Sequence, residues 1–540
     1  MKPAHDNQAR PSDYGLQSTD YGLRTTEMRS LPDNPATLLR NLAACCAARG
    51  VSAWLVGGAA RDLALGLMPH DLDVTVDANG LELARQFADM IDASFVPLKD
   101  ERGAGRVVTR SIDAATGARL VLDLVQLQAP TLEEDLRLRD FTINALALPI
   151  ADQADQAAAF IDPCGGLPDI AARRLRPCSP ASLPNDPLRI LRAVRFGAAL
   201  GFAVTPELDQ AIRQYAPRIT HPAAERVRDE LLKLLHLPNA APWLRYLDAT
   251  RVLTQIFPEL EPARACDQPG VHFLPVLAHT LEAVVALEWL LAGLAPEVEP
   301  LPRTPPLLPA AVQTYPDLPR NLAYRERWRT HLAESPGTGG SRAGLLKLAT
   351  LLHDNAKPQT KQSKPDGGIS FYGHQDIGAA IAQAVGRRLR LSRQEVAYVT
   401  LVVREHMRPG QLRNTSGVTP RAIARFLRDT GTAGPDLLLH NLADHMATRG
   451  PLIDPDDWRH HLAWTNELLV TCWGQPPERS RPLVSGHDLM QHLGIAPGKL
   501  VGTLLAEIRT AQAAGEITTP DEALAHARQM IAAWEAEGAG

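Results

Sequence analysis

The chain has 540 residues, of which 45% are hydrophobic and 22% charged. This is several times the length of a typical domain, so we expect several hydrophobic cores and not one small module. The composition excludes a disordered or fibrous protein, and the formal net charge of -5 excludes a globally basic nucleic-acid binder. The net charge does not exclude a local basic cleft, because the electrostatic field at a cleft does not depend on the total charge.

The sequence favours a cytoplasmic protein without a membrane contact. It contains neither a run of 18 apolar residues nor a leader with a basic and then an apolar part. The six cysteines form no Cys-x-x-Cys pair. We therefore expect thiols buried in a core, and neither a zinc ribbon nor a disulfide framework.

The periodicity of the apolar residues predicts a change of fold class along the chain. Short β-rich runs alternate with helical stretches at first, and helical periods dominate afterwards. We predict an α+β protein with five parts: a disordered tail (1–33), a head with a mixed sheet and helices (34–160), an all-α neck (161–260), a helical body (261–473) and a helical tail (474–540). A proline-rich insert within the body (296–342) is predicted to be an extended surface loop.

A first constellation lies in the head, where Leu55-Val-Gly-Gly-Ala-Ala-Arg-Asp precedes His70-Asp-Leu-Asp-Val. Asp71 and Asp73 are two apart in a predicted strand, so their side chains share one face and can hold one Mg²⁺. Gly57 and Gly58 end the preceding strand and Arg61 opens a helix. Free backbone N–H groups at such a helix start favour a triphosphate.

This combination resembles the nucleotidyltransferase head of the polymerase β superfamily, in particular the bacterial class II tRNA nucleotidyltransferases (CCA-adding enzymes) and poly(A) polymerases. Asp123 is a candidate third catalytic carboxylate. The equal alternative is that Asp123 has a structural role in its strand. The run from Arg139 to Leu146 resembles the second motif of the family. The resemblance implies that Arg139 contacts phosphates, and that Asp140 and Asn144 fix the sugar and the pocket.

A second match lies in the neck, where Asn185-Asp-Pro-Leu-Arg-Ile-Leu-Arg resembles the base-recognition helix of the family. The resemblance implies that Asp186 and Arg189 select the incoming C or A from one helical face, and that Arg192 continues that face toward the phosphates. Asn185 stands where the family usually has Glu, which removes a charge beside the pair. A basic track for the RNA end is predicted from six arginines: Arg173, Arg174, Arg176, Arg189, Arg192 and Arg195.

The body contains a second constellation, in which the run from Leu348 to Asp354 resembles an HD-domain helix. Neighbouring His and Asp side chains on a helix can reach one ion. The resemblance implies a set of metal ligands spaced along the chain: His279, His353, Asp354 and Asp444, with His374 and His406 in two-metal proteins. It implies a divalent transition metal and a phosphohydrolase or phosphodiesterase acting on 2′,3′-cyclic or phosphorylated RNA ends. The alternative is that these histidines persist as a structural remnant in the body of the enzyme.

We predict an enzyme that adds C, C and A from CTP and ATP to the 3′ end of tRNA without a template. Alternatives within the class are a poly(A) polymerase and an enzyme that adds only CC or only A. The Arg-rich strand motif of poly(A) polymerases is absent from residues 96–103, which favours tRNA. An alternative from another class is an HD phosphohydrolase with a regulatory nucleotide-binding head. The glycine-flanked helices of the tail fit either tRNA binding or simple helix punctuation, and the oligomeric state stays open.

Overall fold

The computed structural model describes residues 33–69, 71–98, 103–112, 119–150, 159–268, 270–294, 321–337, 339–365, 367–414, 419–474 and 482–538. Residues 1–32 of the predicted N-terminal tail and residues 296–320 of the predicted insert lie outside this part of the chain. The described residues form two compact units. One contains the chain up to Glu230 together with Tyr246–Ile256, and the other contains Leu231–Arg245 and the chain from Phe257 onward.

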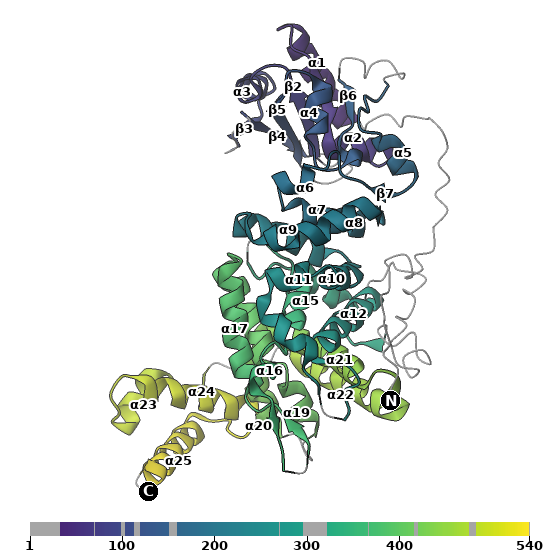
Figure 1. The fold of residues 1–540 in the computed structure, drawn as a ribbon. Helices are drawn as coiled ribbons and strands as arrows, with labels where there is room; N and C mark the ends of the chain where they lie inside the picture. Colours follow the sequence, from purple (N-terminus) through teal and green to yellow (C-terminus); the bar gives the residue numbers. More distant parts are fainter. Residues whose placement is uncertain are drawn as a thin grey trace, which may run out of the picture. The chain divides into compact units, whose positions relative to one another are not determined.

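The first unit begins with a six-stranded mixed sheet of order β3-β4-β5-β2-β1-β6 (Figure 1). Only the β2–β5 pair is parallel, and the other neighbours are antiparallel. Helices α1 and α3 contribute to one core with the strands. The elements are α1 (Asp33–Ala47), β1 (Ala53–Val56), α2 (Gly57–Ala64), β2 (Asp71–Val76), α3 (Gly80–Met90), β3 (Ser94–Pro97), β4 (Gly105–Ile112), β5 (Arg119–Gln126), α4 (Leu132–Arg137), η2 (Thr142–Asn144) and β6 (Ala147–Pro149).

The sheet separates apolar from acidic side chains by the alternation along each strand. In β2, Leu72 and Val74 are buried in the core, whereas Asp71 and Asp73 belong to the opposite face. The parallel register pairs Asp73 with Asp123 of β5. The same alternation that builds the core therefore brings the acidic side chains together on one face.

After the sheet, the first unit continues as short helices and one two-stranded parallel sheet, β7–β8. Helix α7 ends at Leu200 and is followed by Gly201, which has a left-handed φ of 67° that suits glycine. The neck elements are α5 (Gly166–Ala171), β7 (Arg174–Leu175), α6 (Ser182–Asn185), α7 (Arg189–Leu200), β8 (Ala203–Val204), α8 (Pro206–Tyr215), η4 (Ala216–Thr220), α9 (Ala224–His236), α10 (Ala240–Ala249) and α11 (Val252–Ile256).

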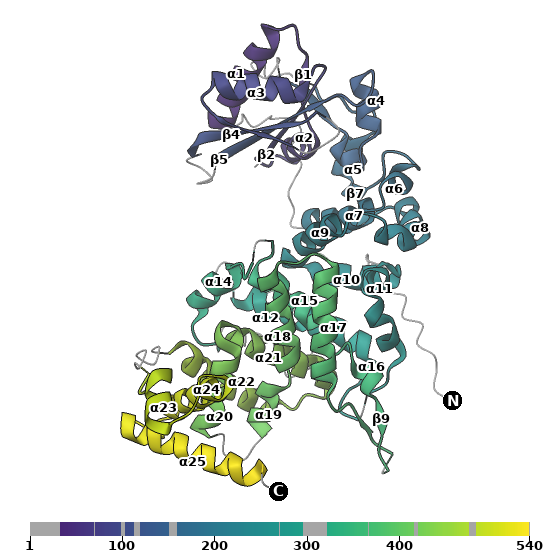
Figure 2. The same cartoon turned by 90° about the vertical axis from the view of Figure 1, so that its left-hand side faces the viewer.

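The second unit is helical, with a short hairpin β9–β10 beside α16 (Figure 2). Helix α12 is apolar and long enough to cross a membrane, but 83% of its apolar window is buried inside the chain, as in a core helix. The body elements are η5 (Pro258–Ala265), α12 (Val276–Leu294), α14 (Arg325–Ala333), α15 (Arg342–Leu352), α16 (Lys357–Thr360), β9 (Gln362–Ser363), β10 (Ile369–Ser370), α17 (His374–Arg388), α18 (Arg393–Glu405), α19 (Arg408–Asn414), α20 (Pro420–Thr430), η7 (Gly431–Ala433), α21 (Gly434–Arg449), η8 (Gly450–Leu452) and α22 (Pro455–Trp473).

The tail forms a small core of its own within the second unit. Its helices are α23 (Gly486–Leu493), α24 (Lys499–Ala513) and α25 (Pro520–Gly538). Leu489, Leu504 and Ile508 are buried among them. Three arginines of α20, Arg421, Arg425 and Arg428, reach Glu507 of α24, so ion pairs connect the tail to the body.

Two local predictions are wrong. The insert predicted as an extended loop over 296–342 contains helix α14, whose Trp328 is fully buried. Asp186 and Arg189 were predicted on one helix face, but Asp186 has an extended conformation and α7 begins only at Arg189. Pro187 is the physical reason, because a residue that precedes proline avoids the helical region.

Candidate functional site

Three predicted carboxylates gather on one face of the head sheet. Asp71 and Asp73 belong to this face of β2, and Asp123 is the register partner of Asp73 on β5. Arg106 of β4 holds both oxygens of Asp123, with Nε and Nη2 each 2.8 Å from an oxygen. Asp123 therefore contributes charge to the site through a carboxylate that an arginine already fixes.

The electrostatics of Asp73 indicate a site that attracts a cation. Burial and the neighbouring charge of Asp123 raise the pKa of Asp73 to about 6, with Asp71 adding to the shift and Arg139 opposing it. Two or more hard carboxylates that repel each other and point into a partly open site are the ligands that Mg²⁺ prefers. The residues present therefore fit that ion.

The glycine pair at the start of α2 lets the backbone approach this site. Gly57 has a left-handed φ of 65°, and a Cβ atom there would lie 3.0 Å from Arg139 Nη1 and 3.4 Å from Asp73 Oδ2. A Cβ atom on Gly58 would lie 3.7 Å from Nη2 of Arg61. At Gly57 the backbone conformation favours glycine, and a Cβ atom there would push against the Arg139 guanidinium. The helix begins at Gly57, so Arg61 lies within it and does not open it.

A chain of polar contacts links the predicted phosphate-binding residues. Nη1 of Arg61 donates to Asn144 Oδ1 at 2.9 Å, and Asn144 Nδ2 donates to Asp140 Oδ1 at 3.1 Å. The other oxygen of Asp140 accepts from Nε and Nη2 of Arg192 at 2.8 and 2.6 Å. Arg139 donates to Thr75 at 3.2 Å. The structure thus joins four predicted residues in one network that spans α2 and α7.

The predicted base-selecting pair lies at the start of α7. Oδ2 of Asp186 accepts from Nη2 of Arg226 at 2.7 Å, and Oδ1 accepts from the Leu188 N–H at 3.2 Å. The guanidinium of Arg189 instead donates to the carbonyl oxygens of Leu138 and Arg139 at 2.9 and 3.1 Å. The two side chains are therefore held by different partners, and Arg226 is a neighbour that the sequence reading did not assign.

The predicted basic track is largely neutralised within the first unit. Arg174 and Arg176 each pair with Asp169, and Arg195 pairs with Glu230. Arg192 pairs with Asp140 as described above. The prediction considered only residues 173–195. It therefore missed Asp140 and Asp169, which precede this range, and Glu230, which follows it.

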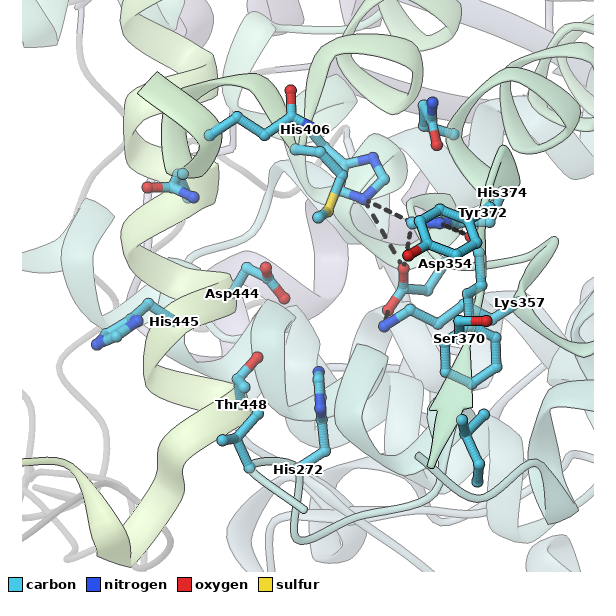
Figure 3. A pocket seen from close by; sticks show the side chains of 18 of the residues that line it. His272, Asp354, Lys357, Ser370, Tyr372, His374, His406, Asp444, His445 and Thr448 are labelled. Carbon is cyan, nitrogen blue, oxygen red and sulfur yellow. Dashed lines mark hydrogen bonds and ion pairs between the residues drawn. The ribbon is translucent and has the colours of Figure 1, made fainter. Parts of the chain in front are cut away.

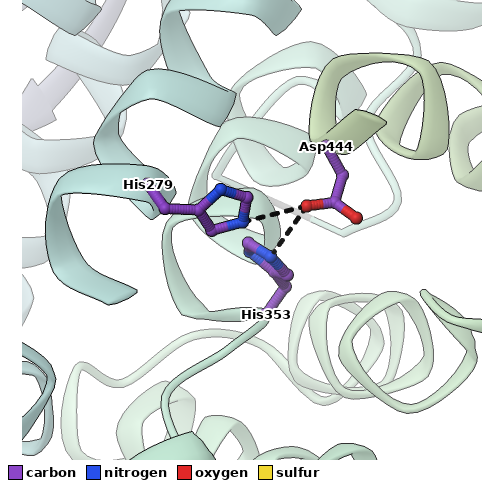
Figure 4. A group of neighbouring side chains, drawn as sticks. All are labelled: His279, His353 and Asp444. Atoms are coloured by element: carbon purple, nitrogen blue, oxygen red, sulfur yellow. Dashed lines mark ion pairs between the residues drawn. The ribbon is translucent and has the colours of Figure 1, made fainter. Parts of the chain in front are cut away.

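Six predicted side chains of the second unit form two adjoining groups of potential metal ligands. Ligand atoms of His279, His353 and Asp444 lie within 4.8 Å of one another, and so do those of Asp354, His374 and His406. Figure 4 shows the first group, in which the two imidazoles face one oxygen of Asp444, with Nε2 of His279 at 3.0 Å and of His353 at 3.4 Å.

Asp354 connects the two groups. Its Oδ2 lies 3.1 Å from Nε2 of His353, and its Oδ1 lies 3.5 Å from Nε2 of His374 and 3.8 Å from that of His406. Lys357 places Nζ 2.7 Å from Oδ2. The carboxylate therefore has one oxygen toward each group, an arrangement in which it can bridge two ions.

Backbone carbonyl groups orient the imidazoles. Nδ1 of His353, His374 and His406 lies 2.8, 2.7 and 2.7 Å from the carbonyl oxygens of Thr350, Phe371 and Val403. Each contact leaves Nε2 free to act as a ligand, as in many metal sites.

The electrostatics of the cluster also point to a cation. Burial disfavours a charged His353, yet Asp354 and Asp444 raise the pKa of its imidazole to about 10. The cluster therefore binds a proton strongly at His353. A metal ion can occupy the position of that proton. Nitrogen and oxygen donors together suit a divalent transition metal.

This cluster borders a cavity of about 630 Å³. Asp354, His374, His406 and Asp444 lie along its wall, together with Lys357 (Figure 3). His353 and Asp354 lie in a turn just after α15, which ends at Leu352, and not on the helix itself. That placement lets adjacent residues face both metal groups.

Comparison with known proteins gives four matches in chain order. Residues 53–176 match the poly A polymerase head domain, and 201–264 match the probable RNA and SrmB-binding site of polymerase A. Residues 330–433 match the HD domain, and 477–527 match the putative tRNA nucleotidyltransferase domain 2.

Full-length relatives decide the family. The A-adding tRNA nucleotidyltransferase of Deinococcus radiodurans is 34% identical over 90% of this chain and 96% of its own length. The CC-adding tRNA nucleotidyltransferase of Thermus thermophilus is 32% identical with the same coverage. The chain belongs to the tRNA nucleotidyltransferase family. It is therefore a nucleotidyltransferase, and its HD domain is part of the family architecture.

Solved structures agree with this fold. A CCA-adding enzyme in complex with ATP matches with a TM-score of 0.57 and 19% identity over 94% of this chain and 95% of that one. The Thermotoga maritima CCA-adding enzyme complexed with tRNA_CCA matches with a TM-score of 0.55 and 20% identity over 93% and 97%. The polymerase β-like head and helical body that we predicted for this nucleotidyltransferase are confirmed.

Proposed function

We propose that this nucleotidyltransferase builds the CCA terminus of tRNA from CTP and ATP, with the head as its active site. The observation that supports this most is the acidic face of Asp71, Asp73 and Asp123 beside the glycine pair of α2. When bound by Asp71 and Asp73, Mg²⁺ supplies acidity to the attacking 3′-hydroxyl and neutralises charge on the phosphates. Such a reaction uses soluble nucleotides and RNA, and we propose the cytoplasm as its location.

The surrounding residues position the triphosphate. We assign Arg61 and Arg139 to the phosphates, because both guanidinium groups border the glycine pair. The network from Arg61 through Asn144 and Asp140 to Arg192 holds the first of them in place. Free N–H groups at the start of α2 add further donors toward the anion.

Asp186 and Arg189 supply the selection of bases. Cytosine and adenine both present an amino donor beside a ring-nitrogen acceptor, whereas uracil and guanine present the reverse order. A carboxylate acceptor and a guanidinium donor therefore fit the first two bases and not the others. Arg226 positions the Asp186 carboxylate by its 2.7 Å contact.

The first experiment is a product ladder on tRNA transcripts that end before the CCA, after the first C, and after CC. We expect CTP alone to add two residues, ATP alone to extend only the CC end, and both to complete CCA. Products that stop at CC, or addition of A alone, would identify a partial enzyme. A long ladder with ATP alone would identify a poly(A) polymerase.

Variants assign the site within that assay. Asp71→Asn is expected to abolish addition, whereas Asp92→Asn, in an exposed ion pair of the same unit, is expected to leave it unchanged. Addition at the wild-type rate by Asp71→Asn would contradict the assignment. For base selection, Arg226→Gln is expected to lower the preference for CTP over UTP. Arg228→Gln, two residues along the same helix, serves as its control.

A second candidate function is metal-dependent hydrolysis of phosphate esters by the HD body. It is favoured by the two groups of ligands that share Asp354 on the wall of a cavity. A metal ion bound there supplies a nucleophilic hydroxide and charge neutralisation. Lys357 lies at the same wall, where its ammonium can contact a phosphate oxygen.

Reciprocal variants separate the two activities. His353→Ala is expected to abolish hydrolysis of a cyclic phosphodiester in the presence of Mn²⁺ or Ni²⁺ and to preserve nucleotide addition. The exposed His487→Ala in the tail is the matched control. Hydrolysis that His353→Ala loses and Asp71→Asn keeps, with no nucleotide addition by the wild-type chain, would instead support a hydrolase with a regulatory head.

A further inference from the structure

Lysines are rare in this chain, and they gather beside the HD cavity. Only eight of the 56 basic residues are lysines, and three of these eight fall within residues 357–364: Lys357, Lys361 and Lys364. Residues 357–373 contain a single acid, Asp366. Arginine predominates elsewhere, so the composition of the chain does not account for this run of lysines.

The structure places this segment at the mouth of the cavity. Hairpin β9–β10 carries Lys361 immediately before its first strand, and Lys364 immediately after it (Figure 2). Lys364 and Ser370 both line the cavity that contains Asp354. Lys361 is exposed. Lys364 therefore presents a cationic side chain to the cavity, and Lys361 exposes a second one at the other end of the same short strand.

An exposed aromatic ring lies next to these lysines. Tyr372 is 75% exposed, the highest fraction among the large apolar or aromatic side chains of the described residues. It also lines the cavity, between Ser370 at the end of β10 and the metal-ligand candidate His374 (Figure 3). The ring is exposed beside the cavity, where it can offer a face on which a base stacks.

We propose that the hairpin lysines Lys361 and Lys364 together with Tyr372 form a lip that binds the 3′-terminal nucleotides of single-stranded RNA, so that the terminal phosphate enters the HD cavity. Proteins bind single strands by combining a cationic track for the backbone with an aromatic ring on which a base stacks. The cavity of about 630 Å³ accommodates one nucleotide. The nucleotides that precede it then lie over the lip.

This inference rests on the hydrolase function proposed for the HD body, and it adds the residues that hold the RNA strand beside the cavity. The test compares a hexaribonucleotide ending in a 2′,3′-cyclic phosphate with a 2′,3′-cyclic mononucleotide, using the full chain loaded with Mn²⁺. We expect kcat/KM to be higher for the hexamer. A higher value for the mononucleotide would overturn the proposal.

The variants test each part of the lip. Tyr372→Ala is expected to lower kcat/KM for the hexamer about fivefold to a hundredfold through lost stacking, with the mononucleotide unchanged, and Tyr372→Phe is expected to retain the wild-type value. Lys361→Gln/Lys364→Gln is expected to reduce the slope of log KM for the hexamer against log salt by about 1.4. Lys499→Gln, an exposed lysine of the tail, is the matched control. Unchanged hexamer preference in both lip variants would refute the proposal.

A binding measurement keeps the lip testable if no hydrolysis occurs, an outcome that refutes the hydrolase function alone. A 3′-phosphorylated hexamer, which the head cannot extend, carries 4-thiouridine at its penultimate position and is cross-linked by ultraviolet light. Cross-links within residues 361–373 support the lip. Cross-links confined to other peptides overturn it.

Discussion

Asp140 provides a sharp test of how the head network is held together. Its buried carboxylate accepts from Nε and Nη2 of Arg192 and from the N–H of Phe141, at 2.8, 2.6 and 2.8 Å. Asp140→Asn keeps the shape of the side chain and removes its charge. Loss of one partner of a buried ion pair costs about 3–5 kcal/mol. Because the Arg192 side chain is 33% exposed, we expect the lower value, about 3 kcal/mol.

The assay is the thermal unfolding of the full chain, followed by a signal of the first unit. A loss of about 3 kcal/mol lowers Tm by about 6–12 °C in a unit of this size. The matched control is Asp92→Asn, whose side chain is 78% exposed and pairs with Arg110. It is expected to cost less than about 1 kcal/mol. Equal melting of the two variants would refute the assignment of Asp140 as a buried, paired carboxylate.

The pH dependence of the free energy of unfolding tests the same carboxylate, Asp140. Burial alone would raise the pKa of Asp140, but the charge of Arg192 and hydrogen bonds from Asn144 and Phe141 lower it overall. A carboxyl group with a depressed pKa stabilises the fold above its unfolded value of about 3.9, and this contribution is lost as the pH falls through the folded value. The stability difference between wild type and Asp140→Asn should therefore shrink toward acid pH. A constant difference would contradict the ionised state of Asp140.

Two further substitutions probe the glycine pair and the tail. Gly57→Ala and Gly66→Ala carry the same cost of a positive φ, about 1 kcal/mol. The Cβ atom of the first variant would lie 3.0 Å from a guanidinium nitrogen, whereas nothing lies within 4 Å of the Cβ atom of the second. We therefore expect kcat/KM for CTP to fall at least about tenfold in Gly57→Ala alone. Glu507 is partly buried, but three arginines of α20 lower its pKa to about 2; Glu507→Gln should loosen the tail, seen as faster hydrogen exchange in α24. Glu516→Gln, which removes one ion pair, should change it less.

The sequence was sufficient where a local period fixes the geometry. Asp71 and Asp73 could be assigned to one face because a strand alternates every two residues, and the structure places them there. The HD ligands could be chosen because the runs around them resemble HD-domain proteins in chain order, and the structure brings their ligand atoms together. The Asp186-Pro187 step was also a readable signal, since it predicts an extended Asp186 before α7, and the prediction of a shared helix face overlooked it.

The sequence was insufficient where partners come from distant segments. Arg106 reaches Asp123 because β4 and β5 pair in one antiparallel register, and neither strand contains that information alone. Glu230 pairs with Arg195 across 35 residues. The net charge of a window therefore overestimates the positive field of a surface whenever acids outside the window fold back onto it.

The two clusters of potential metal ligands differ in donor chemistry, and this difference suits the two reactions proposed for the chain. In the described part of the head the cluster offers carboxylate oxygens, and guanidinium groups of Arg61 and Arg139 lie beside Asp73 at the glycine pair. The body offers imidazole nitrogens with the bridging oxygens of Asp354. Hard oxygen donors select Mg²⁺, and mixed nitrogen and oxygen donors favour transition metals. Because the two sets belong to different compact units, a substitution can alter the donor atoms of one set without altering those of the other.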